Sequence, residues 1–131
     1  MSSATAKRVL IIEDDPIVAM VVEDILRDMG HEVLINLTLE HALLELDEGE
    51  VEVDAVLLDM QLRGEDAHPV VLDLLARKLP FLVLSGSDQS ALKSEFPHIR
   101  IVAKPFGKAV LEEAVRELLN PGIDPASSSP R

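Results

Sequence analysis

Short apolar runs alternate along the chain with segments whose apolar residues recur at helical spacing. The runs are rich in Val, Ile and Leu, which is typical of strands covered on both faces of a sheet. They predict strands at Arg8–Glu13, His31–Asn36, Asp54–Leu58, Pro80–Ser85 and Arg100–Ala103.

Between these strands the apolar residues recur every three or four positions, which indicates amphipathic helices. Asp15 before Pro16 is a good cap for the first helix, and Gly30 is a good residue to close it. The other helices are expected from Thr38 to near Gly49, at His68–Lys78, at Ser87–Glu95 and at Gly107–Leu119. The apolar faces assigned to the first, third and last helices include Val21, Leu75 and Val110.

The order of the elements is strand then helix, repeated five times, which favours an α/β fold with a parallel sheet and helices on both faces. We expect one domain over residues 8–120, a flexible N-terminus over residues 1–7 and a disordered C-terminal tail over residues 121–131. Gln61–Asp66 is expected to form a polar loop.

Composition and charge narrow the function classes. The 131 residues include no cysteine, which excludes disulfides and thiolate chemistry. The net charge of −12 argues against direct nucleic-acid binding, which needs a basic surface. The chain contains neither a signal peptide nor an apolar run long enough to span a membrane, so a cytoplasmic protein with no membrane partner is expected. The four histidines lack metal-binding spacing and are expected on the surface.

Polar residues follow the apolar runs where strands end. In an open parallel sheet the functional crevice lies beyond the carboxyl ends of the strands. The first strand ends in Glu13 and Asp14, and the third ends in Asp59. The fourth ends in Ser85, and the fifth ends in Lys104. We therefore expect these five residues to converge at one edge of the sheet.

The convergence of three carboxylates requires a compensating positive charge. A hard divalent cation with oxygen ligands fits, and Mg²⁺ fits best because it needs few protein carboxylates. Asp59 beside Mg²⁺ and Lys104 is a poised nucleophile for phosphorus, and Ser85 would hold a further phosphoryl oxygen. Asp15 is expected to be only the helix cap.

Four short stretches resemble the motif set of response-regulator receiver domains: Ile11–Pro16, Leu57–Asp59, Leu84–Gly86 and Lys104–Phe106. The resemblance covers about Arg8 to Leu119. It implies a flavodoxin-like, doubly wound (βα)5 fold with strand order 2-1-3-4-5.

The resemblance also implies roles. Glu13, Asp14 and Asp59 would bind Mg²⁺ with the backbone carbonyl of Gln61, and Asp59 would be the phosphoacceptor. Ser85 would supply the switch hydroxyl, and Lys104 would contact the phosphoryl group from before a cis peptide to Pro105.

Three departures from the receiver pattern concern the switch. The loop after Asp59 lacks the usual proline, and Ile101 stands where an aromatic residue is usual, so an aromatic rotamer switch is absent. The stretch Ser87–Arg100 is short, so its helix is expected to be stunted.

The chain resembles a stand-alone receiver, monomeric or weakly dimeric, in a two-component phosphorelay. Its expected partners are a histidine kinase or phosphotransfer protein and an unidentified downstream protein, with no catalytic role beyond its own phosphorylation and dephosphorylation. Two alternatives stay open. One is a pseudo-receiver that binds partners without phosphorylation, although such chains typically lack part of the residue set. The other is a Mg²⁺-dependent phosphohydrolase, although Gln61 stands where those enzymes carry a second acid.

Overall fold

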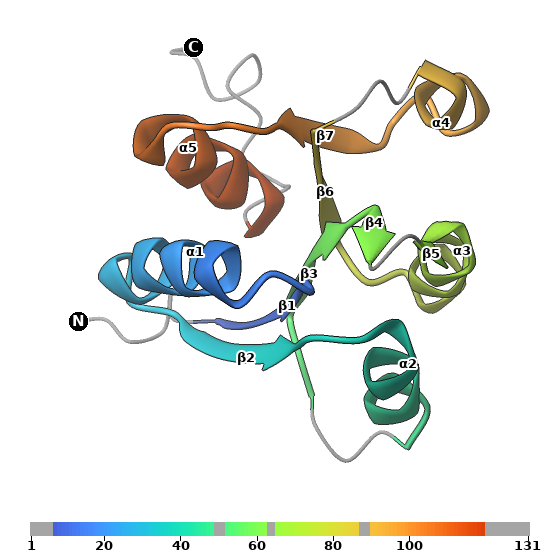
Figure 1. Ribbon diagram of the computed structural model, residues 1–131, viewed down its shortest axis with the longest axis horizontal. Helices are drawn as coiled ribbons and strands as arrows, with labels where there is room; N and C mark the ends of the chain where they lie inside the picture. The colour runs from blue at the N-terminus through green and yellow to red at the C-terminus, as the bar shows by residue number, and fades with distance from the viewer. Residues whose placement is uncertain (1–6, 49–51, 63–64, 87–89, 120–131) are drawn as a thin grey trace, which may run out of the picture.

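A five-stranded, fully parallel sheet forms the centre of the protein (Figure 1). The computed structural model describes residues 7–48, 52–62, 65–86 and 90–119. The strands of the sheet are β1 (Arg8–Ile12), β2 (Glu32–Asn36), β3 (Ala55–Asp59), β6 (Phe81–Ser85) and β7 (Arg100–Ala103). Their order is β2-β1-β3-β6-β7. Because β6 and β7 are the fourth and fifth strands of this sheet, the predicted flavodoxin-like order 2-1-3-4-5 is confirmed.

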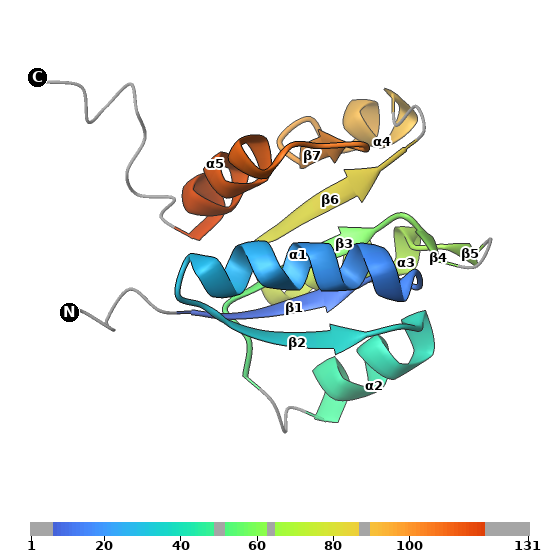
Figure 2. The ribbon, with the colours of Figure 1, turned by 60° about the vertical axis from the view of Figure 1, so that its left-hand side comes forward.

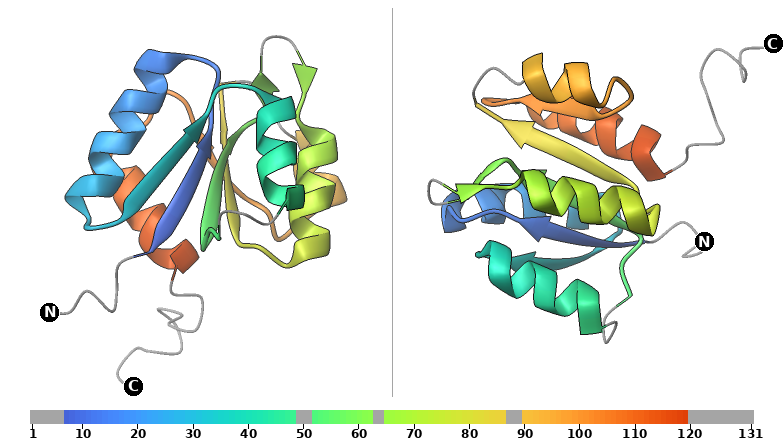
Figure 3. Two further views of the ribbon diagram at one scale, coloured as in Figure 1. Left: turned by 90° about the horizontal axis from the view of Figure 1, so that it is seen from below. Right: turned by 90° about the vertical axis from the view of Figure 1, so that its right-hand side faces the viewer.

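Helices cover both faces of the sheet, as predicted for a doubly wound fold. They are α1 (Pro16–Asp28), α2 (Leu39–Glu48), α3 (His68–Arg77), α4 (Ser90–Glu95) and α5 (Lys108–Leu119). One face carries α1 and α5, and the other carries α2, α3 and α4 (Figures 1 and 3). The six residues of α4 make it the shortest of the described helices, which agrees with the stunted helix predicted there.

Two hydrophobic cores lie on the two faces of the sheet. Successive side chains of a strand point to opposite faces, so Val9 and Ile11 of β1 pack under α1 and α5, while Leu10 and Ile12 pack under the other three helices. All four side chains are essentially inaccessible to solvent. The continuous apolar runs therefore reflect burial on both faces.

The predicted capping residues act locally as expected. The carboxylate of Asp15 accepts a hydrogen bond from the backbone N–H of Ile17 at 2.9 Å, which caps α1. The hydroxyl of Thr38 accepts one from the backbone N–H of His41 at 3.1 Å. Gly30 has a positive φ of 94° just beyond α1, a conformation that favours glycine at a helix end.

The prediction of inward-facing residues was wrong at three positions. Val21 is 49% exposed, Leu75 is 42% exposed and Val110 is 57% exposed. Each helix has only one side against the sheet, and each residue turns the helix by about 100°. Apolar residues outside that buried arc therefore face solvent.

The segment after β3 was predicted as a polar loop and instead contains a small antiparallel ladder. β4 (Gln61–Leu62) pairs with β5 (Glu65–Asp66). Short local pairing of this kind satisfies backbone groups within the segment itself.

Some predictions concern residues outside the described part of the chain. These are the flexible N-terminus up to residue 6, the C-terminal tail, the end of the second helix at Gly49 and the start of the fourth at Ser87. Among the described helices, none combines the length and apolar character of a membrane span.

Candidate functional site

The arrowheads of the sheet strands point to one end of the molecule, where α1 begins and β4 and β5 lie (Figure 2). Glu13 and Asp14 directly follow β1, and Asp59 is the last residue of β3. The parallel register pairs Ile12 with Leu58, so the next residues, Glu13 and Asp59, leave neighbouring strands side by side.

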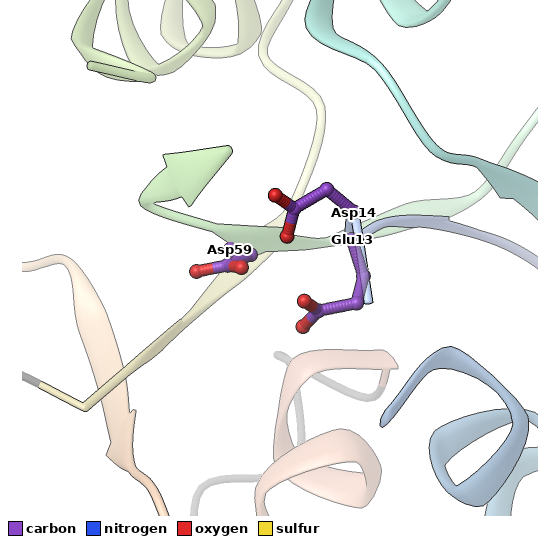
Figure 4. A group of neighbouring side chains, drawn as sticks. All are labelled: Glu13, Asp14 and Asp59. Atoms are coloured by element: carbon purple, nitrogen blue, oxygen red, sulfur yellow. The ribbon is translucent and has the colours of Figure 1, made fainter. Parts of the chain in front are cut away.

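The side chains of Glu13, Asp14 and Asp59 gather around one space beyond these strand ends (Figure 4). One carboxylate oxygen from each residue lies within 4.8 Å of the other two. Glu13 and Asp59 are buried, and Asp14 is half-buried. Burial weakens the screening of like charges by water, so the cluster needs a cation or protons to be stable.

Lys104 supplies one positive charge to this cluster. Its ammonium donates a hydrogen bond to Glu13 Oε1 at 3.1 Å and lies 3.5 Å from Asp59 Oδ2. Lys104 follows β7 at the edge of the sheet, and its peptide bond to Pro105 is cis, as the resemblance implied. The side chain bridges the ends of two more central strands.

The titration properties of the site follow from this arrangement. Burial raises the pKa of Glu13 to about 7, and the neighbouring Asp59 carboxyl adds to the rise, while Lys104 opposes it. Burial alone would lower the pKa of Lys104, but its contacts with Glu13 and Asp59 outweigh burial and raise that pKa above its ordinary value. Close to neutral pH, the cluster therefore holds protons or a cation more readily than isolated carboxylates do.

Ser85 lies buried at the end of β6, on the side of Asp59 away from β1. The register pairs Leu84 with Asp59, so Ser85 stands one residue further toward the carboxyl-terminal edge. Its backbone carbonyl accepts a hydrogen bond from the backbone N–H of Lys104 at 2.8 Å. This bond links Ser85 directly to the lysine of the site.

Sequence reasoning missed Asn36 as a supporting residue. Asn36 is buried at the end of β2, where its backbone carbonyl accepts the N–H of Glu13 at 3.1 Å. Its side-chain amide donates to Glu45 of α2 at 2.9 Å. The sequence does carry a signal for this role, because Asn36 is a polar residue at the end of an apolar run, as Asp59 and Ser85 are.

The structure thus brings Glu13, Asp14, Asp59 and Lys104 into one cluster and places Ser85 at its border. Asp15 points its carboxylate at the backbone of α1, in agreement with a purely capping role. Gln61 opens β4, two residues after Asp59, and the participation of its carbonyl stays a prediction.

The donor set suits one kind of chemistry. Three carboxyl groups with no nitrogen or sulfur ligand among them match a hard, oxygen-preferring cation. A carboxylate held beside such a cation and an ammonium can attack an electrophile that carries negative charge, because both cations stabilise charge on the incoming group. Asp59 belongs to the carboxyl cluster and also lies 3.5 Å from the Lys104 ammonium, so it is close to both positive partners that this chemistry requires.

Comparisons with known proteins agree with this geometry. The phyllosphere-induced regulator PhyR of Methylorubrum extorquens is 26% identical over 122 residues, which cover 91% of this chain and 46% of PhyR. The chain therefore spans about half the length of this curated relative. The solution structure of SdrG from Sphingomonas melonis Fr1 has a TM-score of 0.74 at 33% identity and covers 91% of this chain and 99% of that one.

A third neighbour shares the fold at lower identity. It is the receiver domain of a sensor histidine kinase from Pseudomonas aeruginosa PAO1, solved with a magnesium ion coordinated in its active site cleft. Its TM-score is 0.74 at 22% identity, and the match covers 88% of this chain and 98% of that one. The family model of the response regulator receiver domain matches residues 9–116, from within β1 to within α5. With its parallel sheet, its acidic cluster and its lysine in place, this chain belongs to the response regulator receiver domain family.

Proposed function

We propose that this receiver domain accepts a phosphoryl group on Asp59 in a Mg²⁺-dependent reaction and signals through protein contacts. The observation that carries the proposal is the cluster itself. Carboxyl groups from two neighbouring strand ends lie within 4.8 Å of one another, and the Lys104 ammonium lies 3.5 Å from Asp59. The cytoplasmic location expected from the sequence belongs to this proposal.

The proposed metal ligands are Glu13, Asp14, Asp59 and the backbone carbonyl of Gln61. Oxygen-only ligation and a high local density of negative charge suit Mg²⁺. The Pseudomonas neighbour, which has the same fold, was solved with this ion. When bound, Mg²⁺ would neutralise charge on the phosphoryl oxygens and on the carboxylates.

The proposed transfer uses the side chains of this chain for the remaining steps. A carboxylate oxygen of Asp59 forms a bond to phosphorus, and the bond between phosphorus and the imidazole nitrogen of a donor phosphohistidine breaks, which returns the electron pair to that nitrogen. Lys104 is close enough to Asp59 to pair with a phosphoryl oxygen. The Ser85 hydroxyl, at the end of the adjacent strand, would donate to another.

The surface beside the cluster supports a protein as the phosphodonor. The outward face of the first half of α1 is apolar, with Ile17 72% exposed, Met20 60% exposed and Val21 49% exposed. Exposed apolar residues that adjoin one another mark protein interaction sites. A histidine kinase or phosphotransfer protein that docks there would lie beside the start of α1, where Glu13 and Asp14 are found.

A substitution on this surface can distinguish an effect on the docking of the donor protein from an effect on phosphoryl transfer. A Met20→Glu variant should accept phosphate from a small donor at the wild-type rate, and more slowly from a phosphorylated histidine kinase. Equal rates from the kinase in both proteins would remove this face from the donor interface.

Two observations favour phosphotransfer over the alternatives. The complete set of acidic, hydroxyl and ammonium groups argues against a pseudo-receiver. The amide side chain of Gln61 cannot act as a general acid, which argues against a phosphohydrolase.

The test is the intact mass of the protein after incubation with Mg²⁺ and acetyl phosphate. The wild-type chain should gain one phosphoryl group, and Asp59→Asn should gain none, because an amide oxygen is a far weaker nucleophile than a carboxylate. Asp54→Asn is the matched control, since Asp54 lies at the opposite end of β3 and accepts the backbone N–H of Arg8 at 2.8 Å. Equal labelling of Asp59→Asn and the wild type would overturn the proposal.

A further inference from the structure

A histidine joins α3 to α4, which lie on the same face of the sheet (Figure 1). His68 is the first residue of α3, and its Nε2 lies 3.0 Å from Oε1 of Glu95, the last residue of α4. The His68 ring also packs against Phe96, with ring centroids 5.8 Å apart and planes tilted by 39°. We refer to His68, Glu95 and Phe96 as the α3–α4 latch.

The latch adds side-chain contacts to a helix that has few buried residues of its own. This helix has six residues, and Leu92 is its one fully buried side chain. After Glu95 the chain makes a turn, in which the backbone N–H of Phe96 donates a hydrogen bond to the carbonyl of Leu92 at 2.8 Å. An element with so few buried contacts opens at low free energy, so even a modest hydrogen bond and ring contact at its end change how often it opens.

The other side of His68 is connected to the candidate phosphoacceptor. The residue before it, Ala67, is fully buried, and its N–H donates to the carbonyl of Met60 at 3.2 Å. Met60 directly follows Asp59 and donates its own N–H to Leu84 of β6 at 3.4 Å. A short path of covalent and hydrogen bonds therefore runs from the end of β3 to the His68 ring.

We propose that His68 is a positioning residue that couples the state of Asp59 to the position of α4. A change at Asp59 that shifts Met60 and Ala67 moves the start of α3, and the latch passes this movement to the end of α4. This coupling rests on the proposed phosphorylation of Asp59, whereas the restraint of α4 by the latch does not. Because coupling free energies are reciprocal, loosening the latch must also change how tightly the site holds a phosphoryl analogue.

The restraint is tested in the Mg²⁺-free protein. In His68→Ala, the amides of α4 should exchange with solvent about fivefold faster than in the wild type, while those of β1 and β3 stay unchanged. Glu95→Ala removes the other partner of the contact and should also speed amide exchange in α4. His98→Ala is the matched control, because His98 is exposed and lies two residues beyond the latch, and it should exchange as the wild type does. Unchanged α4 exchange in both latch variants would overturn the inference.

The coupling is tested with Mg²⁺ and beryllofluoride, measured by calorimetry. His68→Ala should bind the analogue with an affinity that differs from the wild-type value by at least about threefold, and His98→Ala should not. If the wild type binds beryllofluoride and His68→Ala binds it equally well, the coupling is wrong and the proposed function stands. If the wild type does not bind it, both the proposed function and the coupling fail, and the exchange measurement still decides whether the latch restrains α4.

Discussion

The two ends of the parallel sheet both carry charged side chains, but they arrange them in opposite ways. At the carboxyl-terminal end, carboxylate oxygens of Glu13, Asp14 and Asp59 lie within 4.8 Å of one another. At the amino-terminal end, Arg8 and Glu32 form an ion pair at 2.9 Å. One end gathers three carboxyl groups, two of them in contact with Lys104, and the other end pairs an arginine with a glutamate.

The charged side chains at the two ends also differ in their exposure to solvent. The side chain of Glu13 is 1% exposed, whereas that of Glu32 is 68% exposed. An exposed pair of opposite charges contributes little to stability and needs no further partner. A buried group of like charges lowers stability unless a ligand or a proton compensates, so its presence in a small domain is evidence for a binding function.

The largest expected effect concerns the compensating cation. Lys104→Met should lower the free energy of unfolding by about 2 kcal/mol in Mg²⁺-free solution, because it leaves buried carboxylates without their counter-charge. Arg8→Met removes a cation from the opposite end, where the side chain is 42% exposed, and should cost less than about 1 kcal/mol. Urea unfolding followed by circular dichroism measures both. Equal losses would mean that the two ends do not differ energetically.

Bound Mg²⁺ should offset the repulsion among the carboxylates at the carboxyl-terminal end of the sheet. Millimolar Mg²⁺ should raise the free energy of unfolding by about 1 to 2 kcal/mol, since it binds only the folded site. Asp14→Ala should abolish this increase, and Glu32→Ala should preserve it. The chain has no Trp or Tyr, so calorimetry or circular dichroism is the suitable probe. A melting curve insensitive to Mg²⁺ would count against a metal site.

The acidity of Glu13 predicts how the Mg²⁺-free protein responds to pH. Its pKa rises from 4.5 to about 7 on folding, so the folded state binds the proton more tightly. The stabilisation is complete below the unfolded pKa and is lost as the pH rises through about 7. The wild type should therefore lose stability relative to Glu13→Gln as the pH rises from 4.5 to 7.5. Parallel pH profiles for the two proteins would contradict this assignment.

The smallest expected effect has the opposite sign and belongs to the amino-terminal end. Burial, with a further contribution from Lys7, lowers the pKa of His31 below 6.5. Its neutral Nδ1 accepts the backbone N–H of Lys7 at 3.1 Å, and protonation removes that acceptor. The stabilisation is present above pH 6.5 and is lost as the pH falls through the folded pKa. The loss of stability at low pH should be below about 1 kcal/mol in the wild type. It should be smaller in His31→Gln and should stay at the wild-type size in His98→Gln.

Much of the fold was predictable because strong local signals agreed with the tertiary structure. The apolar runs identified all five strands of the sheet, and Asp15, Thr38 and Gly30 marked helix ends. The inward-facing residues were less predictable, as Val21 and Val110 show. Apolar character does not reveal which arc of a helix the sheet covers.

The candidate site was predictable to the extent that its residues end strands. Glu13, Asp14 and Asp59 each follow an apolar run, and parallel strands bring their ends to one edge. Asn36 ends a run in the same way but was overlooked, since its hydrogen bond to Glu45 depends on how α2 packs against β2. The short ladder of β4 and β5 carried no recognisable strand pattern.

The sequence by itself determined the order of the elements and the chemical groups at the strand ends, because both follow from local patterns of apolar and polar residues. The tertiary structure alone decided which groups touch. Lys104 reaches Glu13 across 91 positions of sequence, and His68 meets Glu95 across 27. Such contacts depend on strand order, register and helix position, which fix distances between side chains that no local pattern relates. The charge balance of the site and the latch on α4 are therefore properties of the folded chain.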